Sequence, residues 1–181
     1  MENKSYQSHH VLHSYCVYPE TRFESQDNDE KVILTLRAHP FTQIHWIVKS
    51  FLLMIVFILI NIFVASFLNL VQLIFLNFFG LVIVLSYVWF NFLNWFFNVG
   101  IVTTTQIIDI DFSSILYKEV SAARLNKVED VTSKSGGYFE SFFDYGDLFV
   151  QTAGAEKNVE FMNIPKPAEA IEVINTLLGK K

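Results

Sequence analysis

Residues 50–108 read SFLLMIVFILINIFVASFLNLVQLIFLNFFGLVIVLSYVWFNFLNWFFNVGIVTTTQII, and this stretch decides the fold. Its 59 residues include no Asp, Glu, Lys or Arg, although the 181-residue chain has 13 basic and 18 acidic residues. A bilayer core of about 30 Å needs about 20 apolar residues in a helix that rises about 1.5 Å per residue. The stretch therefore predicts a transmembrane helical hairpin, with helices at about 47–68 and 73–96.

The basic residues near the helix ends predict the orientation of this hairpin. The connection at residues 68–72 has none, whereas basic residues flank both outer ends: Lys31, Arg37, Lys49, Lys118, Arg124 and Lys127. Because Lys and Arg concentrate in cytoplasmic segments, we expect a multi-pass protein of the cell membrane with both termini in the cytoplasm. Trp46 and Trp95 would then lie at the cytoplasmic interface of the bilayer, where aromatic residues are enriched.

The segment before the hairpin divides near residue 30. Residues 1–30 are polar and lack the early apolar core of a signal peptide, so we expect a flexible tail. In residues 31–46 we expect a pre-membrane segment with one strand at 32–36 that pairs with the C-terminal domain. The tail carries four possible metal ligands, but their spacing fits no standard site and we expect no metal or cofactor: His9, His10, His13 and Cys16.

After the hairpin, residues 97–178 predict a mainly antiparallel β domain closed by a C-terminal helix at 166–178. The pattern predicts strands at 99–108, 114–121, 127–133, 148–152 and 159–164, with a turn at Asp109–Asp111. The helix should begin near Pro167, and its predicted apolar stripe is Ala168, Ile171, Ile174, Leu177 and Leu178.

Several ordered motifs in this region are similar to those of one known family. They are LRAHP at 36–40, VTTTQII at 102–108, VEDV at 128–131, YGDLFVQTAG at 145–154 and FMNIP at 161–165. Together with two helices before the β domain, they resemble the bacterial pleckstrin-homology-like (PH-like) family of small membrane proteins. The resemblance covers about residues 31–178 and implies a barrel or half-barrel capped by the C-terminal helix. Gln106 departs from the family pattern, which implies a basic residue there.

The residues give little support for catalysis or for binding of charged ligands. Asp109 and Asp111 would share one face of an extended segment and form a possible cation or acid–base pair, but a turn is the simpler interpretation. No nucleophile–base set or phosphate loop is present, so we expect no enzyme. With net charge −5 and scattered basic residues, we expect no nucleic-acid binding and weak or absent phosphoinositide binding.

Carboxamide side chains lie within the apolar helices. Asn77, Asn91, Asn94 and Asn98 fall on nearly one face of the second helix at about 100° per residue, and Asn61 on the first helix is a candidate partner. We favour helix–helix packing through these side chains, because carboxamides hydrogen-bond across membrane helices. The alternative is a polar path through an oligomer.

Two functions follow from these patterns. The first is a membrane-anchored interaction or scaffold module on the cytoplasmic face, which binds a protein partner or a second copy of itself through an unpaired strand edge or a surface loop. The candidate contact residues lie in the aromatic-rich loop 136–143: Tyr138, Phe139, Phe142 and Phe143. The alternatives for this loop are that it lies against the lipid surface or against the core of the domain itself. The alternative function is a small oligomeric transport or pore-forming membrane protein whose Asn face lines the lumen.

Overall fold

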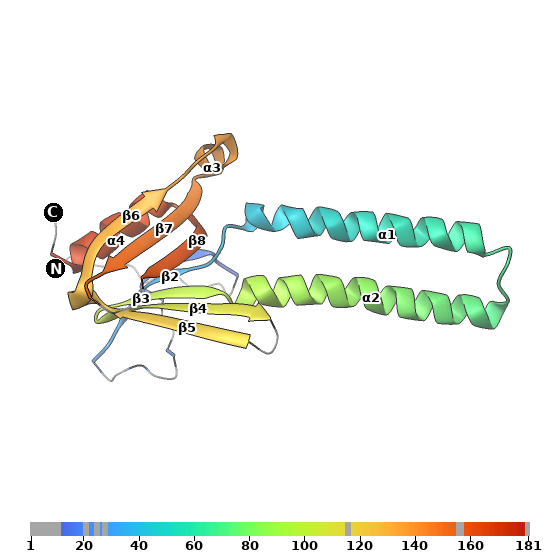
Figure 1. The fold of residues 1–181 in the computed structure, drawn as a ribbon, viewed down its shortest axis with the longest axis horizontal. Helices are drawn as coiled ribbons and strands as arrows, with labels where there is room; N and C mark the ends of the chain where they lie inside the picture. The colour runs from blue at the N-terminus through green and yellow to red at the C-terminus, as the bar shows by residue number, and fades with distance from the viewer. Residues whose placement is uncertain are drawn as a thin grey trace.

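The computed structural model describes residues 12–19, 22–23, 26, 29–114, 117–154 and 158–179. These residues form a β domain from which two long helices run side by side (Figure 1). The strands are β1 (Tyr15–Val17), β2 (Val32–Leu36), β3 (Val99–Thr103), β4 (Gln106–Ser114), β5 (Tyr117–Arg124), β6 (Val128–Lys134), β7 (Tyr145–Thr152) and β8 (Val159–Pro165). The helices are η1 (Pro40–Gln43), α1 (Ile44–Val64), α2 (Leu70–Phe97), η2 (Leu125–Lys127), α3 (Tyr138–Phe143) and α4 (Pro167–Leu177).

The described strands form two antiparallel sheets. One sheet has the order β1-β2-β3-β4-β5, and the other has the order β6-β7-β8. The sequence analysis left a closed barrel open as one possibility. Within the described residues no hydrogen-bonded ladder joins the two sheets, so the domain is not a closed barrel.

One apolar core lies between the two sheets and α4. The fully buried side chains come from strands of both sheets and from the helix, and include Leu34, Val102, Ile107, Leu148, Val150 and Ile174. Gly100 in β3 makes room for this packing, because a Cβ there would lie 2.4 Å from the ring of Phe161 in β8. The glycine therefore allows the two sheets to approach each other closely.

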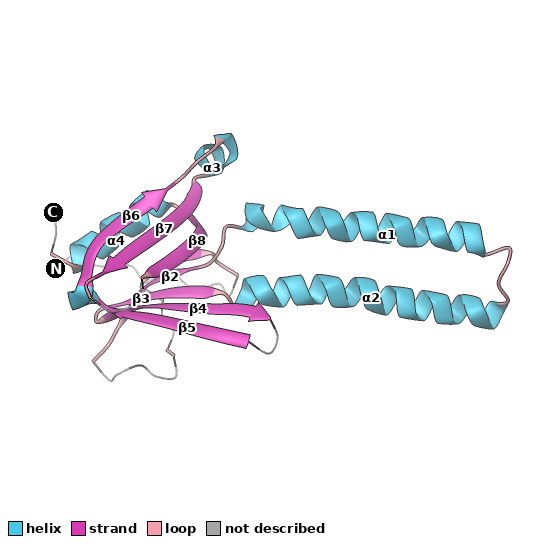
Figure 2. Cartoon of the chain, in the orientation of Figure 1, coloured by secondary structure: helices cyan, strands magenta, loops and turns pink. Residues whose placement is uncertain are grey.

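The helical hairpin is an insertion between two paired strands. β2 ends at Leu36 and β3 begins at Val99, yet Leu36 pairs with Gly100 and Thr35 pairs with Ile101 in the antiparallel ladder. In an ordinary β-hairpin these strands would be joined by a short turn. Here α1 and α2 occupy the position of that turn (Figure 2).

Polar and aromatic contacts join the hairpin to the sheet at this point. Trp95 Nε1 in α2 donates a hydrogen bond to the Ala38 carbonyl at 2.8 Å. The Asn98 side-chain oxygen accepts a hydrogen bond from the Phe112 backbone N–H at 2.6 Å. The Arg37 guanidinium lies 4.8 Å from the ring centre of Phe96. Both ends of the hairpin are therefore attached to the β domain by specific contacts.

The two long helices pack against each other through one polar contact and one close approach. Asn77 Nδ2 in α2 donates a hydrogen bond to Asn61 Oδ1 in α1 at 2.9 Å. Nearby, a Cβ on Gly80 would lie 2.0 Å from the ring of Phe57, so the missing side chain makes space for that ring. Asn69 begins α2 with a capping box in which its side chain and that of Gln72 exchange hydrogen bonds with the backbone.

The predicted turn at Asp109–Asp111 is wrong. Both residues lie within β4, where Asp109 pairs with Ser121 and Asp111 with Glu119. The chain turns earlier, at Thr104 and Thr105, and the predicted strands 99–108 and 114–121 are replaced by β3, β4 and β5. The Thr103 hydroxyl stabilises this turn, because it accepts hydrogen bonds from the backbone N–H groups of Thr105 and Gln106.

The expectation of a flexible tail over residues 1–30 is wrong for its described part. β1 forms an outer strand against β2, and Cys16 in it is fully buried. Tyr15 packs against the core, and burial together with the nearby Glu169 and Glu172 raises its pKa to about 12. His9 and His10 lie outside the described residues, so the structure gives no account of them.

Helix α4 lies against β6 and β7, but its buried face differs from the predicted stripe. Ala168 is exposed, whereas Pro167, Ala170 and Ile174 are buried. Ile171, Leu177 and Leu178 are partly buried at the edge of the core. The predicted stripe is therefore wrong at Ala168, and it omits Pro167 and Ala170, which belong to the core.

Candidate interaction surfaces

A short aromatic helix projects from the β domain where the sequence analysis expected a loop. The segment YFESFF, α3, connects β6 to β7 and stands clear of the two sheets near the start of α1 (Figure 1). Gly137 before the helix has φ +133°, a conformation that suits glycine, and Asp144 ends it in a left-handed conformation with φ +51°. The chain thus enters and leaves α3 through two sharp changes of direction.

Three of the four predicted contact residues on α3 are strongly exposed. The exposed fraction is 95% for Tyr138, 81% for Phe142 and 66% for Phe139. Large aromatic side chains gathered at an exposed tip are unusual on a protein surface that only contacts water. The fourth, Phe143, is partly buried and turns toward the rest of the protein.

Phe143 contacts the beginning of the hairpin. Its ring stacks on that of Phe41 in η1, with ring centres 3.9 Å apart, and the Phe139 ring lies 6.0 Å from the same partner. The ring of His39, two residues before Phe41, stacks on the ring of Tyr145 at the start of β7. The entry to α1 therefore meets two consecutive segments that lie about a hundred residues later in the chain: α3 and the start of β7.

His39 positions this entry. Its Nδ1 accepts a hydrogen bond from the Phe41 backbone N–H at 3.1 Å, and its own backbone N–H donates to the Asn163 carbonyl at 2.7 Å. Burial lowers the pKa of His39, an effect that the nearby Asp144 carboxylate opposes. A neutral imidazole therefore holds the chain at the point where it leaves the β domain.

A second surface is the outer edge of β5. This strand pairs only with β4 among the described residues, so one edge of it has no strand partner there. Val120 on β5 is 52% exposed and pairs with Ile110. Lys118, Glu119 and Arg124 place charges along the same strand, which protects an open edge from indiscriminate pairing.

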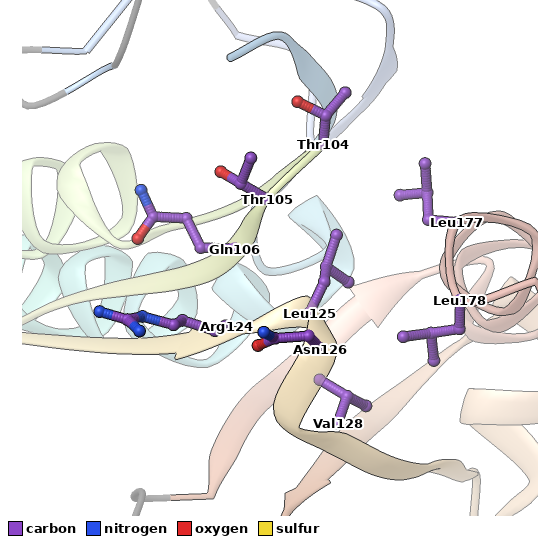
Figure 3. A pocket seen from close by; sticks show the side chains of 9 residues that line it. All are labelled: Thr104, Thr105, Gln106, Arg124, Leu125, Asn126, Val128, Leu177 and Leu178. Carbon is purple, nitrogen blue, oxygen red and sulfur yellow. The ribbon is translucent and has the colours of Figure 1, made fainter. Parts of the chain in front are cut away.

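A large polar groove of about 810 Å³ lies at the other end of the β domain, away from the hairpin. The turn Thr104–Gln106, the segment from Arg124 to Val128, and Leu177 with Leu178 of α4 line it (Figure 3). Leu177 and Leu178 face Leu125 and Val128 across the open space. Arg124 is the one basic side chain among the lining residues, so this groove has no concentrated positive charge.

Beside this groove a buried carboxylate is surrounded by donors. Glu30 is 3% exposed, and its Oε1 accepts hydrogen bonds from the Thr103 hydroxyl at 2.5 Å and the Thr105 hydroxyl at 2.6 Å. Gln106 Nε2 donates to the same oxygen at 3.1 Å. Gln106, which departs from the family pattern, therefore has a structural role as a hydrogen-bond partner of Glu30. The sequence analysis missed Glu30 because nothing in the local pattern marks it as buried.

The five carboxamide residues do not act as one set. Asn61 and Asn77 are joined by a hydrogen bond, whereas Asn91 donates to the Tyr87 carbonyl of its own helix. Asn98 follows the last residue of α2 and binds the β4 backbone, so its predicted place in helix–helix packing is wrong. Asn94 lies on α2 and its backbone carbonyl accepts from the Asn98 N–H.

The described residues provide no group of three His, Cys, Asp or Glu side chains that would hold a metal ion. Cys16 is fully buried in β1, and burial raises its pKa, which disfavours the thiolate form. Asp109 and Asp111 line a separate cavity of about 330 Å³ together with Glu160.

The comparison with known families gives one match. A family described as the bacterial PH domain matches residues 44–179, which extend from the first residue of α1 to beyond the last residue of α4. No curated protein and no solved structure matches the chain. The match covers more than half of the chain and includes the helical hairpin as well as strands β3 to β8, so the chain belongs to the bacterial PH domain family.

Proposed function

We propose that this chain is a membrane-anchored interaction module. In this proposal the hairpin crosses the cell membrane, both termini are cytoplasmic, and the PH domain binds another protein at the cytoplasmic face. The observation that carries the proposal is the insertion of the hairpin between β2 and β3. Because both helices continue directly into paired strands, the bilayer would hold the domain in one orientation.

The two long helices support membrane insertion. Pro40–Val64 has 25 residues and Leu70–Phe97 has 28, and both are apolar enough to cross a bilayer. Their apolar side chains are exposed, with Val84 the one buried residue of α2 and none buried in α1. A helix that served as the core of a soluble domain would be covered by other elements. Lipid is the environment that fits these surfaces.

The open edge of β5 is the surface that we assign to a protein partner. In Figure 1 the axes of β4 and β5 lie close to that of α2, with β4 running toward the helices and β5 away from them, so a strand added beside β5 would lie along the direction of the hairpin axis. An extended juxtamembrane segment of another membrane protein has this direction. Backbone hydrogen bonds would provide affinity, and Val120 with its charged neighbours would provide selectivity.

Photocrosslinking in cells tests this proposal. A photoreactive residue at Val120 should yield an adduct with one defined protein, whereas the same residue at Met162 on β8 should not. The control is matched, because Val120 is 52% exposed and Met162 is 55% exposed. If the only adducts are with a second copy of the chain, the β5 edge serves self-assembly and not the binding of another protein. Equal adducts at Val120 and Met162 would contradict the assignment to β5.

The membrane topology needs its own test. A cysteine at Ser66, between α1 and α2, should react with a membrane-impermeant thiol reagent only from outside the cell. A cysteine at Met162 should react only after the membrane is opened. Reaction of both from the same side in intact cells would contradict the proposed spanning hairpin.

The alternative, a transport or pore-forming oligomer, depends on the Asn side chains. The hydrogen bond between Asn61 and Asn77 directs these two groups toward each other, which favours helix packing. Asn91 is the remaining candidate for a lumen. If the alternative holds, Asn91→Leu should abolish solute flux in vesicles while assembly is retained, and unchanged flux would contradict it.

Catalysis and headgroup recognition are not part of the proposal. Asp109 and Asp111 place negative charge on β4, on the side of the sheet that faces Glu160 and Asn163. Acidic side chains at this position oppose the binding of inositol phosphates. We therefore assign the domain a role in protein contact without a cofactor.

A further inference from the structure

We propose that the exposed aromatic residues of α3 insert into the cytoplasmic leaflet of the bilayer, as a second membrane contact beside the hairpin. The residues are Tyr138, Phe139 and Phe142. This inference deepens the proposed function and rests on its membrane-spanning hairpin. It assigns these side chains to lipid instead of to the protein partner that the sequence analysis favoured for them.

The contact between α3 and the hairpin sets the depth of these residues. Phe41 lies within the apolar span Pro40–Val64, at its second residue. The Phe143 ring stacks on Phe41 with ring centres 3.9 Å apart, so α3 is held beside the first turn of this span. If the span enters the bilayer, α3 must lie at the level of the headgroups.

Other aromatic side chains lie at the same end of the hairpin. Trp46 is in the first turn of α1 and Trp95 is in the last turn of α2, and both donate hydrogen bonds from Nε1: to Gln43 Oε1 and to the Ala38 carbonyl. Amphipathic rings with one polar contact are enriched at membrane interfaces. α3 extends this aromatic belt to one side of the hairpin.

The exposure pattern of α3 matches a lipid-facing tip. Tyr138, Phe139 and Phe142 are 95%, 66% and 81% exposed, while Phe143 points back to Phe41. Burial of apolar area in lipid contributes about 25 cal/mol per Å², so three aromatic rings offer a substantial gain. The Phe139 ring lies 6.0 Å from that of Phe41, and the larger part of all three side chains remains exposed.

The charges near α3 predict how this insertion should behave. Glu140 lies on α3, and its carboxylate accepts a hydrogen bond from the Gly136 N–H; Asp144 follows the helix. Lys166 lies close to Asp144, so the two carboxylates leave no net positive charge here that would attract anionic lipids. The contact should therefore be apolar, occur on uncharged phosphatidylcholine, and change little with salt.

Spin labelling of the full-length chain in phosphatidylcholine vesicles tests the inference. A nitroxide is attached at Ser141→Cys in a Cys16→Ala background, which leaves all the aromatic residues of α3 intact. Reference labels at Leu59→Cys in α1 and Met162→Cys on β8 report the bilayer core and water. We expect the Ser141 label to be more accessible to oxygen than to a water-soluble nickel chelate, and to remain so at high salt.

A matched variant isolates the aromatic residues. With Phe139→Ser and Phe142→Ser added, the Ser141 label should become as accessible to the nickel chelate as the Met162 label. Both replaced side chains are exposed, so the fold should be retained, which thermal melting of the variant checks.

The other outcomes each overturn a definite statement. If the Ser141 label is as accessible to the nickel chelate as the Met162 label, while the Leu59 label is in lipid, the insertion of α3 is overturned and the proposed function remains intact. A Leu59 label that matches Met162 overturns the membrane-spanning hairpin itself, and the insertion with it. Dipolar broadening between Ser141 labels overturns the insertion in favour of contact with a second copy.

Discussion

At the scale of single residues, His39 couples the entry of the hairpin to pH. Its Nδ1 must stay unprotonated to accept the Phe41 N–H, and burial lowers its pKa below the ordinary value of 6.5. At pH values between the lowered folded-state pKa and 6.5, His39 binds more protons in the unfolded chain than in the folded chain. The neutral His39 side chain therefore contributes fully to the free energy of unfolding above about pH 6.5. This contribution is lost as the pH falls through the folded-state pKa.

We expect the melting temperature of the β domain in detergent to fall between about pH 8 and pH 5 by more in the wild type than in His39→Asn. The Asn side chain can still accept the Phe41 N–H, but it does not titrate. The difference between the two profiles removes the contribution of the other titrating groups. Parallel profiles would show that His39 does not contribute to the pH dependence.

Glu30 provides a second prediction for a single residue. Glu30→Gln should lower the free energy of unfolding by about 1–3 kcal/mol, because an amide cannot accept from Thr103, Thr105 and Gln106 as a carboxylate does. Chemical denaturation of the detergent-solubilised protein measures this loss. Glu160→Gln, at an exposed position of β8, is the control and should change stability little. Equal effects of the two substitutions would contradict the role of Glu30.

At the scale of elements, the contact between α1 and α2 includes one carboxamide pair, Asn61 and Asn77. A double-mutant cycle with Asn61→Ala and Asn77→Ala should give a coupling free energy of about 0.6 kcal/mol, and no more than about 1.7 kcal/mol. Reversible unfolding in bicelles measures it. A cycle with Asn61→Ala and Asn91→Ala is the control and should give no coupling, because Asn91 bonds within its own helix. Coupling of equal size in both cycles would contradict the specific pair.

The helices could be predicted from sequence more closely than the strands. A long uncharged run has few alternatives, and α1 and α2 lie where the run predicts helices. The strand pattern failed at Asp109–Asp111 because aspartate is common in turns, although here it continues β4. The true turn has no Gly, Pro, Asn or Asp and depends on the Thr103 hydroxyl, which local sequence patterns do not reveal.

The candidate surfaces also combine features that the sequence predicts with features that only the folded structure reveals. The aromatic residues of α3 are conspicuous in the sequence, so they could be named as contact candidates. Their contact with Phe41 joins positions that lie about a hundred residues apart, and only the folded sheet brings them together. β1 was missed for a related reason, since three residues in a polar segment carry almost no pattern of their own.

At the scale of the whole molecule, the β domain should not need the hairpin to fold. Leu36 and Gly100 are adjacent in the ladder, so an Asn-Gly turn that joins Arg37 to Val99 should restore an ordinary β-hairpin. We expect this variant to be folded in aqueous buffer without detergent. Circular dichroism and size-exclusion chromatography measure the outcome.

The control for this variant lacks both β1 and β2. Removal of residues 12–37 as well should prevent folding, because Leu34 and Leu36 are fully buried in the core. A folded protein without β2, or an unfolded one with the Asn-Gly turn, would contradict the view that β2 and the strands after the hairpin form one unit.

The insertion of the hairpin also orders events during synthesis. The ribosome makes β2 first, but its partner β3 follows only after both long helices have been made. Under the proposed topology these helices pass to the membrane insertion machinery in that interval. At roughly 5–20 residues per second, β2 waits several seconds with Leu34 and Leu36 uncovered. Under the proposed topology the sheet closes after insertion, so a chain whose helices fail to insert would leave an unpaired strand that quality-control proteases can recognise.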